Sequence, residues 1–211
     1  MTARYGLPLH LSELGASAGL NLLWDHYALD LGRRRLGPEH PVLTLTPDWT
    51  GPMPPLAAPR VLTRAGADIA PLDPVRDRGR LLAYVWADQT ARLDRCDTAL
   101  TLAARLRPQI TKADAGIWAQ QRLAESFPNA LHLIFHTIAA KYFRPATTAR
   151  LNAALVAAGA KATRQTPLAY LSMERDGPSP GAALTLTLWP GDEIIPLGRA
   201  DFHGRWVNWQ A

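Results

Sequence analysis

The chain has 211 residues, of which 47% are hydrophobic and 19% charged, which is enough apolar material for one domain with a buried core. This composition excludes disorder, and no apolar run approaches the roughly 20 residues that cross a bilayer. A single cysteine excludes an internal disulfide scaffold, and the opening residues lack the apolar stretch of a secretory signal. We therefore expect a cytoplasmic protein without membrane attachment, folded as one domain over residues 1–211.

The charge balance is basic but dispersed. The formal net charge is +5, and the one tight basic run, Arg33 to Arg35, is followed by Gly37 and is expected at the tip of a hairpin. A nucleic-acid binder usually concentrates its basic residues on one face or tail. The pattern favours a solvated surface, and we expect no nucleic-acid partner.

Short apolar strands alternate with helical segments from the start of the chain, which is typical of an α/β sheet. The first strand is expected at 9–14, a glycine-rich turn at 15–19 and helical character at 20–24. Residues 28–60 differ, because two period-two segments flank Arg- and Gly-rich residues and a proline-rich passage follows. This pattern predicts an inserted β-hairpin and a loop after the first helix.

The remaining segments continue the alternation. Further strands are expected at 61–69, 109–111, 131–135 and 168–174, and helical segments at 78–106, 118–124 and 147–158. Beyond residue 180 the pattern predicts strands alone, at 184–188, 194–197 and 205–209. The fold class is therefore α/β: a Rossmann-like three-layer sandwich with a mostly parallel sheet and a C-terminal antiparallel hairpin.

The segment from Glu13 to Gly19, ELGASAG, lies at the predicted strand-to-helix junction. Glycine permits a sharp turn and a close approach of backbone to a ligand, and a helix start offers free N–H groups. The segment resembles motif I of the class I S-adenosylmethionine-dependent methyltransferases, acid-x-Gly-x-Gly-x-Gly. Glu13, Gly15 and Gly19 match three signature positions, and Ser17 replaces the middle glycine.

The resemblance extends beyond this segment. In that family a second acidic residue ends strand two and binds the ribose hydroxyls, and Asp68 resembles it. The insertion at 28–60 accounts for a spacing well above the roughly 20 residues of a compact unit. Asp114, after the third strand, resembles the residue that the family uses near the adenine. The resemblance implies S-adenosylmethionine as cofactor, held by Glu13, Gly15, Ser17, Gly19, Asn21, Asp68 and Asp114.

Two other hypotheses stay open. Residues 15–19 also spell G-x-S-x-G, the nucleophile elbow of α/β-hydrolases, with Ser17 as nucleophile. Asp114 or Glu174, followed by His203, would complete a triad in hydrolase order. Hydrolases, however, place several strands before the elbow. Ser17 in place of glycine also keeps open a non-catalytic domain that binds a nucleotide-like ligand or a protein.

Three residues are candidates for catalysis. His136 ends the fourth expected strand and could accept a proton at neutral pH; the alternative is a histidine at the rim of the core. Glu174 ends the fifth strand, and its alternative is a solvated loop acid. His203 lies near the closing hairpin, and its alternative is a surface turn. Together these three residues would suit zinc or iron, and that alternative stays open, but no short-range ligand spacing connects them, so we expect no metal site.

Several further segments resemble an uncharacterised bacterial family of unknown function. They are the stretches 13–22, 66–73 and 134–137 and the terminal HGRW with Trp209. Members of that family carry an additional helical N-terminal region. The resemblance therefore implies a shortened relative, or a catalytic half that depends on a partner. It implies no activity, and the substrate, small molecule or protein, and the oligomeric state are left open.

Overall fold

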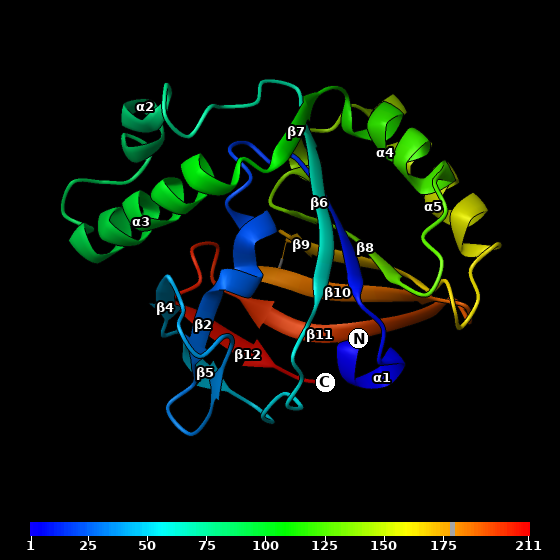
Figure 1. Cartoon of the computed structure of the whole chain (residues 1–211), viewed down its shortest axis with the longest axis horizontal. Coiled ribbons are helices and arrows are strands. Elements are labelled where there is room, and N and C mark those ends of the chain that lie inside the picture. Colours follow the sequence, from blue (N-terminus) through cyan, green and yellow to red (C-terminus); the bar gives the residue numbers. More distant parts are fainter. Residues whose placement is uncertain (178–179) are drawn as a thin grey trace.

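The computed structural model describes residues 1–177 and 180–211, which form a large twisted sheet and a small one beside it (Figure 1). The large sheet has nine strands. In spatial order they are β5 (Asp48–Thr50), β12 (Trp206–Trp209), β11 (Glu193–Ala200), β10 (Ala182–Trp189), β9 (Leu168–Glu174), β8 (Leu131–Thr137), β1 (Leu9–Leu14), β6 (Val61–Asp68) and β7 (Gln109–Lys112).

The parallel part of the sheet has the doubly wound strand order. The strands β7, β6, β1, β8 and β9 pair in parallel, which is the order 3-2-1-4-5 when they are numbered along the chain. The chain reverses its direction of travel across the sheet between β1 and β8, and ligands bind at such a switch point, beyond the carboxyl ends of the strands. β10 and β11 follow in antiparallel pairing, which confirms the predicted fold class and its closing antiparallel strands.

Both faces of the central strands are buried, which explains their nearly continuous apolar sequence. On one face, Leu14 and Ile134 pack under helices α4 (Ala115–Ala124) and α5 (Pro145–Gly159). On the other, Leu9 and Leu133 belong to a cluster that includes residues of the antiparallel strands. The short helix α1 (Thr2–Tyr5) and the 3-10 helix η1 (Asn21–His26) contribute to this second cluster. Residues 20–24, predicted to have helical character, thus begin a 3-10 helix.

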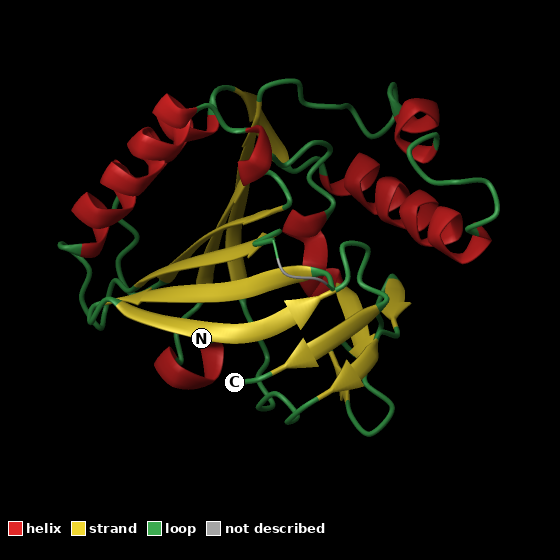
Figure 2. Cartoon of the chain, turned by 180° about the vertical axis from the view of Figure 1, so that it is seen from behind, coloured by secondary structure: helices red, strands yellow, loops and turns green. Residues whose placement is uncertain are grey.

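Helices α2 (Arg78–Leu82) and α3 (Thr90–Leu106) lie across β7 from α4 and α5, as both views show (Figures 1 and 2). Leu100 of α3 packs on Ala18 of the glycine segment, so this helix supports the turn after β1. The helical pattern over 78–106 is interrupted between the two helices. Tyr84 and Trp86 are exposed there, so no buried stripe continues through the break.

The insertion forms the small sheet of β2 (Tyr27–Asp30), β3 (Arg35–Leu36) and β4 (Leu43–Leu45). The sequence pattern predicts a hairpin in which β2 pairs with β4. The structure corrects this pairing: β2 forms its hairpin with β3, and β4 lies parallel to β2. The reason is the tight turn between β2 and β3, which brings the chain back at once, whereas β4 reaches β2 through a longer crossover. The next strand, β5, leaves the insertion and pairs with β12.

Candidate functional site

A cavity of about 430 Å³ opens at the carboxyl ends of β1, β6, β7 and β8. Its lining takes Gly15 from the turn after β1, Asp68 and Ile69 from the end of β6, Asp114 from the turn after β7, and Thr137 from the end of β8. Three of the predicted cofactor residues, Gly15, Asp68 and Asp114, therefore meet around one cavity. We call it the crevice cavity.

Both the backbone conformation and the close packing at position 15 require a glycine. Its φ is +73°, in the left-handed region, and a Cβ atom at this position would lie 2.6 Å from the Cβ of Ala139. Because Ala139 belongs to the segment after β8, this close approach joins the two turns that flank the switch point. Ser17 is also left-handed, with φ +51°, so the turn keeps a glycine-like shape at the position where motif I has its middle glycine.

Replacing Gly15 with alanine is expected to destabilise the fold more than the same change at Gly32. Both glycines have φ +73°, but nothing lies within 4 Å of a Cβ at Gly32. The left-handed conformation costs alanine about 1 kcal/mol at either site. Overpacking against Ala139 adds about 1 to 3 kcal/mol at Gly15 alone. Urea denaturation of both variants measures the difference, and equal losses of stability would contradict the packing argument.

Asp68 ties the glycine segment to the end of β6. Its Oδ2 accepts a hydrogen bond from the backbone N–H of Ser17 at 2.8 Å, and its Oδ1 accepts one from the N–H of Ala70, also at 2.8 Å. Each carboxylate oxygen has a second lone pair, so two further hydrogen bonds can be accepted. Asp68 therefore shapes the turn and still offers two acceptor positions.

Asp114 caps helix α4. Its Oδ1 accepts from the N–H groups of Gly116 and Ile117, and its Oδ2 accepts from the hydroxyl of Thr147 on α5. Burial opposes ionisation, but the bond from Thr147 and the helix N–H groups outweigh it and hold the pKa of Asp114 below its usual range. The residue is an ionised N-cap that joins α4 to α5 at the cavity wall.

Glu13 lies beneath the glycine segment and is not one of the residues that line the crevice cavity. The residue is 2% exposed, and its Oε1 accepts a hydrogen bond from the side-chain amide of Asn21 at 3.0 Å. Its Oε2 has no partner among the described residues. Burial, with Asp68 nearby, raises the pKa of Glu13 to about 8, so this carboxyl carries a proton at neutral pH. The amide of Asn21 also reaches the hydroxyl of Thr137 at 3.3 Å, which connects β1 to the end of β8.

The raised pKa of Glu13 predicts a pH-dependent stability. Between pH 4.5, its ordinary pKa, and about pH 8 the folded state retains a proton that the unfolded state has lost. The stability contributed by the protonated carboxyl is complete below this range and is lost as the pH rises through it. A Glu13→Gln variant lacks this titration, so its stability relative to the wild type should increase between pH 5 and pH 9 by more than about 2 kcal/mol. Urea denaturation across this range measures the change.

Glu39 supplies the matched control, because it is an exposed residue of the insertion. The Glu39→Gln variant is expected to follow the pH profile of the wild type. A Glu13→Gln variant that follows the same profile as well would contradict the assignment of a protonated, buried Glu13.

His136 is the centre of a buried chain of hydrogen bonds. Its Nδ1 lies 2.7 Å from Oε1 of Glu174, and its Nε2 lies 2.6 Å from the hydroxyl of Tyr170. Burial opposes the charge of Glu174, but the bond from His136 and two backbone N–H groups hold its pKa below its usual range. Burial, with Glu174 nearby, raises the pKa of Tyr170 to about 12. Nδ1 therefore donates to a carboxylate, and Nε2 is hydrogen-bonded to the hydroxyl of a protonated tyrosine.

This chain supports one wall of the crevice cavity. Oε1 of Glu174 also accepts hydrogen bonds from the backbone N–H groups of Ala139 and Ala140, each at 2.8 Å. The side chain of Glu174 is 20% exposed, whereas that of His136 is 2% exposed. His136, predicted to be a base, is thus bonded behind the wall, and Glu174 is the ionised member that reaches solvent.

His203 lies in a different cavity, of about 410 Å³, together with Arg92 and Arg95 of α3. Burial and the charge of Arg92 lower its pKa. The structure therefore does not bring His203 to His136 and Glu174. Within residues 1–177 and 180–211, no group of His, Cys, Asp and Glu side chains is arranged to hold a metal ion. In the same ranges no histidine hydrogen-bonds to Ser17, and Gly19 packs on Pro108 without lining the crevice cavity.

The sequence argument missed the segment that closes the crevice cavity. Tyr142, Phe143, Arg144 and Thr147 line it, and they follow the carboxyl end of β8. Ile69, immediately after Asp68, is 69% exposed in the same lining. One signal in the sequence could have indicated this segment. Apolar and aromatic residues follow the strand ends directly, at positions where exposed polar residues are usual.

The strand order and the position of the crevice cavity define a doubly wound α/β protein with a cavity beyond the carboxyl ends of its parallel strands. Residues 1–209 match the family model described as "Uncharacterized protein conserved in bacteria (DUF2332)", and the chain belongs to this family. The match confirms the resemblance to an uncharacterised bacterial family. No curated protein and no solved structure matches the chain. No helix in the part of the chain described here is long and apolar enough to cross a membrane.

Proposed function

We propose that this chain is an S-adenosylmethionine-dependent methyltransferase that binds its cofactor in the crevice cavity. The observation that carries the proposal is the convergence of Gly15, Asp68 and Asp114 on that cavity. These residues come from three separate strand ends, and the resemblance to motif I and its flanking acids predicts each of them as a cofactor residue. Convergence at the switch point of a doubly wound sheet supports a nucleoside-type ligand.

The hydrogen-bonding capacity of the two acids fits such a ligand. Asp68 has one free lone pair on each oxygen, which suits the two vicinal hydroxyls of a ribose. Among the described residues, Oδ2 of Asp114 accepts a hydrogen bond from Thr147 alone, so it can accept one more, from an exocyclic amino group of adenine. Ile69 and Phe143 provide apolar surface between the two acids for the base itself.

Catalysis then depends mainly on positioning. The bound cofactor supplies a methyl group on a sulfonium, and transfer requires in-line alignment with a desolvated nucleophile. Gly15 allows the backbone of the turn to approach the ligand, and Glu174 holds Ala139 and Ala140 in the facing wall. His136 in turn holds Glu174 in the position from which it binds this wall. The substrate class, small molecule or protein, is not part of this proposal.

Calorimetric titration of the purified chain with S-adenosylhomocysteine tests the proposal. Micromolar binding supports it, and the absence of heat at millimolar ligand would overturn it. A Ser17→Ala variant should bind equally well, because Ser17 contributes its backbone N–H to Asp68. Covalent labelling of Ser17 by an activated-serine probe would instead support the hydrolase hypothesis. A non-catalytic binding domain would bind the ligand without turnover of any methyl acceptor.

A further inference from the structure

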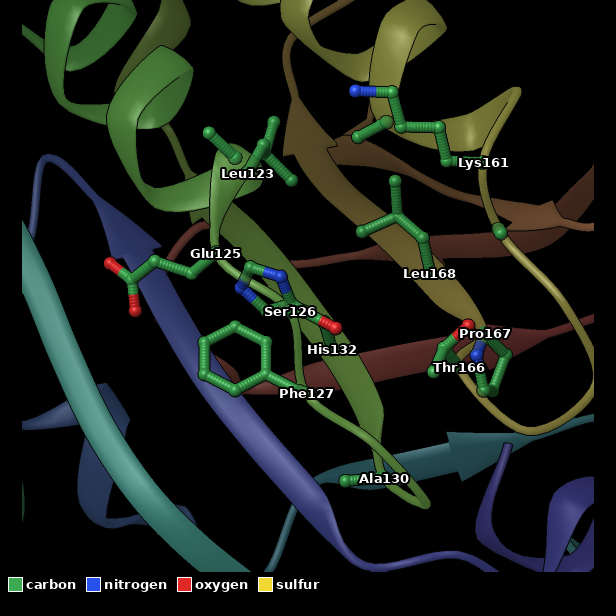
Figure 3. A pocket seen from close by; sticks show the side chains of 13 residues that line it. Leu123, Glu125, Ser126, Phe127, Ala130, His132, Lys161, Thr166, Pro167 and Leu168 are labelled. Atoms are coloured by element: carbon green, nitrogen blue, oxygen red, sulfur yellow. The ribbon is translucent and has the colours of Figure 1, made fainter.

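A second cavity, of about 160 Å³, opens at the opposite edge of the sheet from the crevice cavity. It lies between the carboxyl ends of α4 and α5 and the amino ends of β8 and β9, as its lining shows (Figure 3). The apolar part of this lining includes Leu123, Phe127, Ala130, Ala158 and Leu168. We call it the amino-end cavity. Its volume is close to that of a cavity that accepts a benzene ring, about 150 Å³.

The polar group deepest in the amino-end cavity is His132. This residue is 6% exposed, and its imidazole lies between Phe127 and Leu168 (Figure 3). Its Nε2 lies 2.8 Å from the hydroxyl oxygen of Ser12, and Nε of Arg122 donates to the same oxygen at 3.1 Å. Nδ1 of His132 has no hydrogen-bond partner in residues 1–177 and 180–211.

The neighbours of His132 determine which ring nitrogen carries the proton. Arg122 only donates, so the hydroxyl of Ser12 accepts from Arg122. Ser12 is 0% exposed, and Nε2 of His132 is the one acceptor that its own proton reaches among the described residues, so the hydroxyl donates to Nε2. Burial lowers the pKa of His132 to about 3, and the charges of Arg122 and His10 add to this, so the ring is neutral. The single proton of the ring is therefore on Nδ1. An N–H donor without a partner in residues 1–177 and 180–211 thus lines the amino-end cavity.

The other free polar groups of the lining also favour an acceptor. Lys161 lies just beyond the end of α5 and contributes an ammonium group. Glu125 is the one carboxylate of the lining, and it is engaged by Arg122 at 2.6 Å. In Figure 3 it points away from Leu168 and Lys161. The cavity thus combines apolar walls, a neutral N–H donor and one ammonium group at its rim.

We propose that the amino-end cavity binds a small monocarboxylate whose apolar body is about the size of a benzene ring. The ring rests against Leu123 and Leu168, and the carboxylate accepts a hydrogen bond from Nδ1 of His132 and pairs with Lys161. This site is separate from the crevice cavity, and it shares no lining residue with it.

Titration with benzoate, followed by NMR of the histidine ring nitrogens and the backbone amides, tests this proposal. Saturable shifts of Nδ1 of His132 and of the amides of Ala130 and Leu168 are expected. Benzamide, the neutral isostere, should bind at least about fivefold more weakly. A Lys161→Met variant should weaken benzoate binding about fivefold, because it removes an ion pair at the rim.

Lys112→Met is the matched control, because Lys112 is an exposed lysine at the end of β7 that does not line the amino-end cavity. It should leave benzoate binding unchanged. The proposal is overturned if benzoate produces no saturable shift of His132 at millimolar concentration. Equal binding of benzamide, or shifts confined to crevice residues such as Asp68, would overturn it as well. S-adenosylhomocysteine at saturation should leave benzoate binding in place, so this result does not depend on the proposed methyltransferase function.

Discussion

Replacing Asp68 with alanine is expected to reduce the affinity for S-adenosylhomocysteine on the order of 100-fold. The change removes the acceptor of the Ser17 and Ala70 N–H groups, so the turn after β1 loses its tie to β6. It also removes both acceptor positions proposed for the ribose. Each hydrogen bond to a charged group contributes about 1.5 to 3 kcal/mol, and two such losses account for the expected effect. Calorimetric titration measures it.

Asp30 offers a control of the same local geometry. Its Oδ1 accepts from the N–H of Gly32, two residues ahead, as Oδ1 of Asp68 does from Ala70, but it lies in the hairpin of the insertion. Asp30→Ala should bind S-adenosylhomocysteine like the wild type. Undiminished binding by Asp68→Ala, with the fold intact, would remove Asp68 from the site.

Replacing His136 with leucine should lower the free energy of unfolding by about 3 kcal/mol. The substitution introduces an apolar side chain of similar size and deletes two hydrogen bonds. The hydroxyl of Tyr170 is then buried without its partner, and Glu174 retains only its bonds to the N–H groups of Ala139 and Ala140. The bond to the carboxylate is the stronger of the two lost, because its acceptor is charged. Urea denaturation at neutral pH measures the loss.

The exposed His40 provides the comparison for this measurement. His40→Leu should change the free energy of unfolding by less than about 0.5 kcal/mol. A small effect at His136, matching that at His40, would mean that the buried chain of hydrogen bonds contributes little to stability. Such a result would also contradict the role of His136 in orienting Glu174.

The parallel strands and the crevice residues were predictable for local reasons. Apolar runs bounded by glycine and acidic residues predict buried parallel strands and the edge at which they end, as at Gly15 and Asp68. These signals lie within a few residues of each strand end. Asp114 lines the cavity for the same reason, because it lies two residues after the end of β7.

The chain around His136 depends on strand register, which a single sequence does not reveal. His136 is paired with Ser172 across β8 and β9. Tyr170 and Glu174 are two residues before and after Ser172, so both lie on the same face as His136 and flank it. Shifting the register by one residue would place them on the opposite face.

The positions of the facing wall and of His203 depend on tertiary packing. The segment after β8 begins with Ile138, whose φ of +53° is rare for a β-branched residue and is not signalled by its sequence. His203 lies near the closing strands, and the sequence leaves open whether it faces the crevice or lies in a surface turn. The turn between β11 and β12 brings it to Arg92 and Arg95 of α3.

Through the pairing of β5 with β12, the insertion covers the outer edge of the large sheet. An open edge strand exposes unpaired N–H and C=O groups that can pair with a second molecule. Here the edge strand is only three residues long, Asp48–Thr50, and the chain continues into Gly51 and Pro52. Proline has no N–H to donate, so the strand cannot be extended into a long template. Removing this segment would expose β12, and the large sheet would then be prone to edge-to-edge aggregation.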